Sequence, residues 1–292
     1  MTIANTLIQQ IESHSNRRFE LDKQISVSGG CINQAKILQS AEQRYFVKFN
    51  DADKYPMFQA EALGLEALGA ANAIRIPGVI GYGTEGTQSW LILEYIQFSA
   101  ATTDSAAKTG RQLAELHSHT ADKHGWLQDN TIGSTVQINP QRQSWIAFWT
   151  HARLGYQIQL AIQSGFSGKV ISNAEKLMEN CTSLINHRPV ASLLHGDLWS
   201  GNLGYDEAGE PVLFDPAVYY GDHETDLAMT ELFGGFSSDF YAAYREIKPI
   251  DAGYKVRKQL YNLYHILNHM NIFGGSYESQ AANMASRLLA EI

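Results

Sequence analysis

Cysteine is scarce in this sequence, and its scarcity limits the kinds of site that the chain can build. Cys31 and Cys181 are its only cysteines in 292 residues. Two cysteines cannot make a disulfide framework, and no Cys/His spacing suggests a zinc site. Such a composition is typical of proteins that work in a reducing compartment, so we expect a cytoplasmic location.

Runs of positive charge and long apolar runs are also missing. Lysine and arginine number 22 against 30 aspartates and glutamates, which gives a net charge of −8 at pH 7. An acidic chain without a basic run is a poor candidate for binding nucleic acid or an anionic membrane surface. No stretch approaches the roughly 20 apolar residues needed to cross a bilayer. The N-terminus lacks the basic start and apolar block of a signal peptide. We therefore expect neither nucleic acid nor a membrane as a partner.

The most informative stretch begins at His195 and ends at Asp215. Asp197 and Asn202 lie five positions apart within it, and Asp215 follows the apolar run 211–214. Phosphoryl transfer uses such a set of side chains. One carboxylate accepts the proton of the attacking hydroxyl, while an amide oxygen and a second carboxylate hold magnesium against the nucleotide phosphates. The protein-kinase signature has an Asp, an Asn and another Asp in the same order, so the pattern predicts a phosphotransferase site.

An isolated Asp and Asn at this spacing more often cap a helix or a turn. The flanking residues favour the catalytic interpretation instead. His195 and Gly196 precede the first Asp, as in the kinase signature, and residues 206–210 have the composition of a hairpin turn. The strand that returns from this turn would carry Asp215 back to the cleft that Asp197 faces.

The N-terminal part of the chain has the pattern of a sheet. Strands are predicted over 19–27, 36–39 and 44–49, with Gly29 and Gly30 between the first two. Glycines in such a hairpin allow backbone N–H groups to approach phosphate oxygens. An ordinary hairpin turn has the same appearance, so the glycine pair is weak evidence by itself.

Lys48 lies inside the apolar run 44–49, where a lone charge is unfavourable unless it is paired. The helix predicted over 57–68 carries Glu61 in its first turns, and Glu66 is a second candidate partner. A strand lysine and a helix glutamate in this order resemble the kinase pair that holds the α- and β-phosphates. The alternative is that both side chains are ordinary surface charges.

A buried strand is predicted over 90–96, and in a kinase fold this position joins the two lobes. Backbone groups near Glu94 and Ile96 would bind the adenine edge there. The candidate adenine-binding residues are Leu93, Glu94, Tyr95 and Ile96. A plain core strand has the same periodicity, so the order along the chain is what favours the hinge.

The remaining sequence predicts a largely helical region. Helices are predicted over 106–119 and 255–273, and a loop over 130–140. We expect His117 to be structural rather than a metal ligand, because the nearest histidine points to another helix face. Asp226 precedes a helical run, and we expect it to cap that helix while also bracing the catalytic loop.

Residues 195–236 resemble the fructosamine kinase (ketosamine 3-kinase) family, most specifically in the Leu-Trp-Ser-Gly-Asn string at 198–202. The segments 29–32, 46–48, 137–157 and 268–275 are also similar, so the resemblance covers nearly the full length. It implies an α+β, protein-kinase-like fold with two lobes. Residues 1–95 would form a small antiparallel sheet lobe that binds nucleotide. Residues 96–292 would form a larger, mostly helical lobe with the catalytic and substrate groups.

The resemblance also implies an activity, which is ATP-dependent phosphorylation of the 3-hydroxyl of a ketosamine such as a ribulosamine, erythrulosamine or fructosamine. The unstable phosphate then releases the amine, so the reaction repairs glycation. By motif position, Asp197 would be the catalytic base, and Asn202 and Asp215 would bind Mg²⁺. Lys48 would contact the ATP phosphates with Glu61 as its partner. The substrate would be a small-molecule or protein-bound ketosamine.

Cys31 suggests a separate hypothesis, because it lies in the predicted phosphate loop near backbone N–H groups that would lower its pKa. Some members of the resembled family are redox-sensitive at this position, which implies a redox-linked dimer. An unreactive side chain is the alternative. Two other functions also stay open: a kinase for an aminoglycoside, choline or a free sugar, and a pseudokinase that binds nucleotide without turnover.

Overall fold

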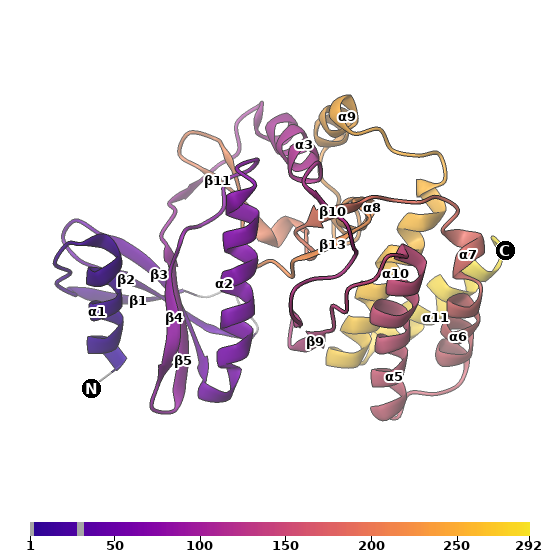
Figure 1. Cartoon of the computed structure of the whole chain (residues 1–292), viewed down its shortest axis with the longest axis horizontal. Coiled ribbons are helices and arrows are strands. Elements are labelled where there is room, and N and C mark those ends of the chain that lie inside the picture. The colour runs from indigo at the N-terminus through magenta and orange to yellow at the C-terminus, as the bar shows by residue number, and fades with distance from the viewer. Residues whose placement is uncertain (1–2, 28–31) are drawn as a thin grey trace.

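The computed structural model describes residues 3–27 and 32–292, which fold into a small lobe and a larger one (Figure 1). The small lobe is built on an antiparallel sheet with the strand order β1-β2-β3-β5-β4. Its strands are β1 (Lys23–Val27), β2 (Gln34–Gln39), β3 (Arg44–Asp51), β4 (Val79–Glu85) and β5 (Gln88–Glu94). The first strand starts four residues later than the sequence predicts.

Helices α1 (Ile3–Ser15) and α2 (Tyr55–Ala70) lie on opposite sides of this sheet (Figure 1). Alternation along the strands explains why. On β3, Val47 packs with Leu7 and Ile11 of α1, whereas its neighbour Lys48 faces the other way. Successive side chains of a strand point to opposite faces of the sheet. The centre of the α1 face is therefore apolar, while the α2 face holds a charge.

The larger lobe is mostly helical, as predicted. Its helices are α3 (Ser105–Leu116), α4 (Trp145–Trp149), the π-helix η2 (Thr150–Gly155), α5 (Tyr156–Gln163), α6 (Lys169–Glu179), α7 (Cys181–Leu184), α8 (Glu224–Thr230), α9 (Ser238–Ile247), α10 (Tyr254–Phe273) and α11 (Ser276–Leu289). Short strands form smaller sheets with the orders β13-β10-β7 and β12-β11-β6. They are β6 (Phe98–Ser99), β7 (Thr120–Ala121), β10 (Ala191–Leu194), β11 (Leu203–Asp206), β12 (Pro211–Leu213) and β13 (Tyr219–Gly221).

Helix α10 forms the centre of the large core. Tyr261, Leu263 and Met270 on this helix are fully buried, and the Tyr261 hydroxyl accepts a 3.0 Å hydrogen bond from the indole N–H of Trp145. Trp149 packs edge-on against the same tyrosine ring. Trp145, Phe148 and Trp149 therefore belong to the core.

The prediction of a loop over 130–140 is wrong. The chain forms a hairpin of β8 (Asn130–Ile132) and β9 (Thr135–Gln137), which turns at Gly133 with φ +62°. Its polar side chains are buried: Asn130 donates to the Val218 carbonyl and Gln137 to that of Ala217. Polar amide side chains are typical of exposed loops. In this hairpin they are buried and bond to a neighbouring segment, so the sequence pattern predicts a loop where the structure has a hairpin.

Among the described residues, no helix is both long enough and apolar enough to cross a membrane.

The arrangement that matters for function is the approach of the two lobes. The hairpin β11–β12 of the large lobe presents its ends toward α2 and β3, so groups distant in sequence meet between the lobes.

We predict opposite effects of the same substitution at two helical glycines. A Cβ at Gly110 of α3 would overlap the Phe240 carbonyl of α9, so Gly110→Ala should destabilise the protein by about 1–3 kcal/mol. Gly69 of α2 has no described atom within 4 Å of such a Cβ, so Gly69→Ala should stabilise by about 0.5–1 kcal/mol. Urea unfolding measures both. Equal changes in the free energy of unfolding for the two variants would contradict the close packing of α3 against α9.

Candidate active site

Lys48 occupies the centre of the space between the lobes. It is only 5% exposed, and its ammonium donates to Glu61 at 2.6 Å and to Asp215 at 2.5 Å. Burial by itself lowers the pKa of a lysine, but here the charges of Asp215 and Glu61 outweigh it and raise the pKa above the usual value. The predicted Lys48–Glu61 pair is therefore confirmed, and the alternative partner Glu66 is not used. The contact with Asp215 was not predicted.

The loop after β10 is fixed by His195 and Gly196. The His195 ring is fully buried, which lowers its pKa and keeps it neutral. Its Nδ1 accepts from the Asp197 backbone N–H at 3.3 Å, so the opposite nitrogen carries the proton and donates to the Phe214 carbonyl at 3.0 Å. Gly196 has φ +83°, and a Cβ there would overlap the Ala217 carbonyl. His195 and Gly196 are thus required by the packing of this loop.

Asn202 brings the loop and the returning strand together. Its amide nitrogen donates to the Asp197 carbonyl at 2.8 Å, to the Asp197 carboxylate at 3.2 Å and to the Asp215 carbonyl at 3.4 Å. Within the described part of the chain, its carboxamide oxygen has no hydrogen-bond partner. The residues predicted to be the base and the metal ligands therefore lie together.

The environment of Asp197 raises the pKa of its carboxyl group to about 7. Burial is the main cause, and the negative charges of Asp215 and Asp226 add to it, while the hydrogen bond from Asn202 opposes it. Across residues 3–27 and 32–292, no cation forms an ion pair with Asp197. A pKa near neutrality is the value at which a carboxylate is most useful as a general base.

Asp215 has an unusual backbone conformation for a residue with a side chain, with φ +56°. Aspartate and asparagine tolerate this left-handed region better than most residues, although at some energetic cost. The Asp215 carboxylate and the unpartnered Asn202 oxygen are hard oxygen donors, which Mg²⁺ prefers. The donor set therefore fits a magnesium ion.

Asp226 anchors the catalytic loop through its backbone. Its carboxylate is 1% exposed and accepts hydrogen bonds from the N–H groups of His195 at 2.7 Å and Gly196 at 2.8 Å. His117 donates a further bond at 3.1 Å. Burial alone would raise the pKa of Asp226, but the bond and charge of His117 hold it below its usual value. The expected brace is confirmed. The expected helix cap is wrong, because Asp226 lies within α8 and its oxygens face the loop.

The predicted hinge follows β5. The Leu93 side chain is buried against α2, and Tyr95 and Ile96 come directly after the strand. Glu94 accepts from the Gly78 backbone N–H at 3.1 Å, and Arg75 donates to it at 2.9 Å. Arg75 also pairs with Asp206 of the β11–β12 hairpin. This bridge ties the end of β5 to the β11–β12 hairpin, whose two ends adjoin Asn202 and Asp215, and nothing in the sequence pattern pointed to it.

An aromatic wall adjoins the catalytic loop, and sequence reasoning did not identify it. Trp199, two residues after Asp197, is 38% exposed and contacts the Phe233 ring at 6.4 Å between centroids. Phe233 contacts His269 at 5.1 Å, and His269 contacts Tyr277 at 5.1 Å. Trp199 is the exposed ring of this wall, and an exposed ring beside the loop is suited to packing against the apolar face of a sugar.

A second cluster of ionisable groups, His187, Asp222 and Glu224, is arranged like a metal site but is better explained as structure. Arg257 donates to both oxygens of Glu224, at 2.6 and 2.8 Å. Tyr261 donates to Asp222 at 2.6 Å. A guanidinium already neutralises the carboxylate that a metal would need, so these groups tie α8 to α10.

The predicted phosphate-loop residues Gly29 and Gly30, and the redox candidate Cys31, lie outside the described residues. The other cysteine, Cys181, is buried, and burial raises the pKa of its thiol to about 12. A thiol with so high a pKa is unreactive at neutral pH.

We predict that Asp197→Asn stabilises the fold at high pH but not at low pH. The native pKa of about 7 lies above the usual value of 3.8, so the native state loses stability as the pH rises through 7. Asparagine mimics the protonated form. The increase in the free energy of unfolding caused by Asp197→Asn should therefore grow between pH 4 and pH 8. It should reach at most a few kcal/mol, since one pKa unit corresponds to about 1.4 kcal/mol.

Urea unfolding at both pH values measures this difference. Asp122→Asn is the matched control, because Asp122 is exposed and away from the site. A gain for Asp197→Asn that is the same at pH 4 and pH 8 would contradict the raised pKa.

Comparisons with known proteins agree with this geometry. A family model described as fructosamine kinase matches residues 3–291. A probable ketoamine kinase of Synechocystis is 48% identical over 97% of this chain and 96% of its own length. A chloroplastic protein-ribulosamine 3-kinase of Arabidopsis thaliana is 43% identical over 89% of this chain and 80% of its own. The crystal structure of a candidate fructosamine-3-kinase from Haemophilus somnus has 30% identity and a TM-score of 0.89, covering 97% of this chain and 96% of that one. The chain belongs to the fructosamine kinase family.

Proposed function

We propose that the chain transfers the γ-phosphoryl group of ATP to the 3-hydroxyl of a ketosamine. The observation that carries this proposal is the position of Asp197. Its carboxyl has a pKa of about 7 and shares the Asn202 amide with Asp215, whose carboxylate also pairs with Lys48. A base, a pair of oxygen ligands and a phosphate-binding cation would thus lie in one space. The chain belongs to the fructosamine kinase family, and a relative is named a probable ketoamine kinase.

Each group has a part in the mechanism. Asp197 orients the substrate hydroxyl and accepts its proton as the phosphoryl group is transferred. Lys48 moves from Asp215 toward the α- and β-phosphates, while Glu61 continues to neutralise it. Backbone groups at 94–96 hold the adenine. Asn202 and Asp215 would hold a magnesium ion, which would supply positive charge beside the phosphates. Because the loop 197–202 has no lysine, the chain supplies positive charge there mainly through Lys48.

The acceptor is a sugar linked to an amine. The Arabidopsis relative is named for protein-bound ribulosamines and the Synechocystis relative for ketoamines, and both names suit a site lined by Trp199 and Phe233. Phosphorylation at the 3-hydroxyl places a leaving group next to the carbonyl carbon. Loss of a proton from C1 gives an enaminol, which expels the phosphate from C3 and leaves an imine at C1. Water hydrolyses this imine to a carbonyl and the free amine, so the reaction amounts to repair of glycation. We place this reaction in the cytoplasm.

The other functions are less well supported. A kinase for aminoglycosides, choline or free sugars would have the same fold, but the relatives reported above are named as ketosamine kinases. A pseudokinase would usually lack part of the machinery, whereas Asp197, Asn202, Asp215 and Lys48 are all present in this chain.

We predict that Asp197→Asn lowers turnover by roughly 10³-fold or more while leaving nucleotide affinity nearly unchanged, because a base acts mainly in the transition state. In the unsubstituted enzyme, kcat/KM should fall as the pH drops below about 7, where Asp197 takes up a proton. ATP consumption is measured with ribulosyl-lysine, fructosyl-lysine, kanamycin, choline and ribose. Turnover of kanamycin or choline alone would refute the ketosamine function, and full activity of the variant would place the base elsewhere.

We predict a different defect for Asp215→Ala. Removing this carboxylate should weaken nucleotide binding in the presence of magnesium by roughly 10- to 100-fold, because a ligand of the ion is lost. Binding without magnesium should change much less. Calorimetric titration with a non-hydrolysable ATP analogue, with and without the metal, separates the two. An unchanged magnesium dependence would contradict the assignment of Asp215.

A further inference from the structure

The segment between α2 and β4 belongs to both lobes, although its place in the sequence assigns it to the small lobe. Ile74 is buried in the core of the large lobe, and Ile76 packs against the cores of both lobes. Arg75 forms a parallel bridge with Val212 of β12, where its carbonyl accepts from the Leu213 N–H at 3.0 Å. The backbone of this segment is therefore fixed to the β11–β12 hairpin.

The side chain of Arg75 joins this segment to the predicted hinge. Its guanidinium donates to Glu94 at 2.9 Å and also to Asp206. The other Glu94 oxygen accepts from the Gly78 N–H at 3.1 Å, and the Glu94 N–H donates to the Gly78 carbonyl at 2.8 Å. The second Asp206 oxygen accepts from two N–H groups of its own turn, at 2.9 and 3.0 Å. Both carboxylates are thus held in place by other bonds, and the planar guanidinium spans the distance between them.

Within the described part of the chain, two ion pairs join the lobes, Lys48–Asp215 and Arg75–Asp206. Under the proposed function the first pair separates when a nucleotide binds, because Asp215 is then needed for the metal and Lys48 for the phosphates. The second pair lies at the turn of the hairpin, away from the end that adjoins Asn202. Nucleotide binding therefore leaves the Arg75–Asp206 pair intact.

The distance between this bridge and the metal ligands makes the angle between the lobes important. Asn202 lies four positions before Asp206, or about 13 Å away at about 3.3 Å per strand residue. A rotation of about 5° around the bridge would shift a group at that distance by about 1 Å, and a shift of about 1 Å can cost roughly 100-fold in rate. A hinge that is loose by a few degrees would therefore be costly to the reaction.

We propose that Arg75 is a positioning residue for phosphoryl transfer. It fixes the angle between the lobes while a nucleotide is bound, and so keeps Lys48 of the small lobe opposite the metal ligands of the large lobe. It acts through Glu94 and Asp206 rather than by contact with the reacting atoms. The inference rests on the proposed function and makes it more specific.

The exposure of this bridge allows positioning to be separated from stability. The side chains of Arg75 and Glu94 are 41% and 40% exposed, and ion pairs exposed to this degree add little to stability. Arg75→Met should therefore unfold at nearly the same urea concentration as the unsubstituted enzyme. A purely structural role would instead reduce the folded fraction, and so lower kcat without changing the affinity for nucleotide.

The experiment measures the affinity of Arg75→Met for two ligands by calorimetry. Adenosine needs the hinge alone, whereas a non-hydrolysable ATP analogue with magnesium needs groups from both lobes. The variant should bind the analogue roughly 10-fold more weakly, since one well-placed contact is lost. It should bind adenosine almost as well as before, because the two bonds between Glu94 and Gly78 remain. With ribulosyl-lysine, its kcat should fall by roughly 10- to 100-fold.

Two further variants test whether the bridge itself is responsible. Asp206→Asn keeps an oxygen for the turn but loses the charge that Arg75 contacts, so it should reproduce the loss of affinity for the analogue. The double variant Arg75→Met/Asp206→Asn should be no worse than either single variant, because both remove the same contact. Arg75→Lys should recover only part of the affinity, since one ammonium cannot span both carboxylates as a guanidinium does.

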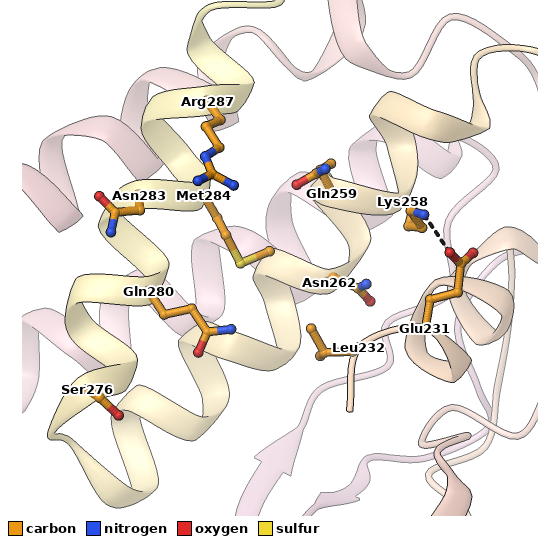
Figure 2. A pocket seen from close by; sticks show the side chains of 10 residues that line it. All are labelled: Glu231, Leu232, Lys258, Gln259, Asn262, Ser276, Gln280, Asn283, Met284 and Arg287. Atoms are coloured by element: carbon orange, nitrogen blue, oxygen red, sulfur yellow. Dashed lines mark hydrogen bonds and ion pairs between the residues drawn. The ribbon is translucent and has the colours of Figure 1, made fainter. Parts of the chain in front are cut away.

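Lys258→Met is the matched control. Lys258 donates to Glu231 at 2.5 Å on the wall of a groove between α10 and α11 (Figure 2), and the other Glu231 oxygen accepts from the Tyr254 hydroxyl at 2.7 Å. This carboxylate is thus also shared by two donors, but the pair lies within the large lobe. Its loss should leave the affinities for adenosine and for the analogue unchanged.

The inference would be overturned by an unchanged affinity of Arg75→Met for the analogue, or by an equal loss for adenosine and the analogue. Additive losses in the double variant would also overturn it. If no ketosamine is phosphorylated, the proposed function fails. The calorimetric comparison needs no acceptor, so it would still decide whether Arg75 sets the geometry of the nucleotide site.

Discussion

The buried ammonium of Lys48 is the contact on which the active site depends. A charge in this position is tolerated only because carboxylates from both lobes neutralise it, Glu61 from α2 and Asp215 from the end of β12. Loss of either partner would leave a charge in a place where water cannot reach it well. The same contact therefore joins a residue of the large lobe to two of the small lobe, and under the proposed function it also keeps a cation ready for the nucleotide phosphates.

The parts of the site that could be predicted from sequence are those set by short-range geometry. Alternation along β3 places Lys48 on the face opposite Val47, and the helical pattern of α2 places Glu61 within its reach. The spacing of Asp197 and Asn202 follows from one tight loop. In each case the chain between the residues is short or regular, so its path has few alternatives.

The parts that could not be predicted depend on contacts between segments with no regular path between them. Arg75 joins Glu94 to Asp206, which is far away in sequence, and no periodicity signals such a bridge. The sequence of the hairpin at Asn130 and Gln137 resembles that of a loop because its polar amides are buried and bond to the carbonyls of a distant segment before β13. Asp226 has the position of a helix cap, but the unpaired N–H groups of the catalytic loop are nearer to its oxygens than those of its own helix.

The way in which Asp226 holds the loop has a consequence for how such enzymes diverge. Its bonds are to backbone N–H groups, which are the same for every residue type, so the anchor does not depend on which side chains follow. Trp199 and Ser200 can therefore be exchanged while the base stays in place. Under the proposed function, substitutions at these positions would change the preferred acceptor while Asp197, Asn202 and Asp215 keep their places, so one scaffold could acquire new substrates by small steps.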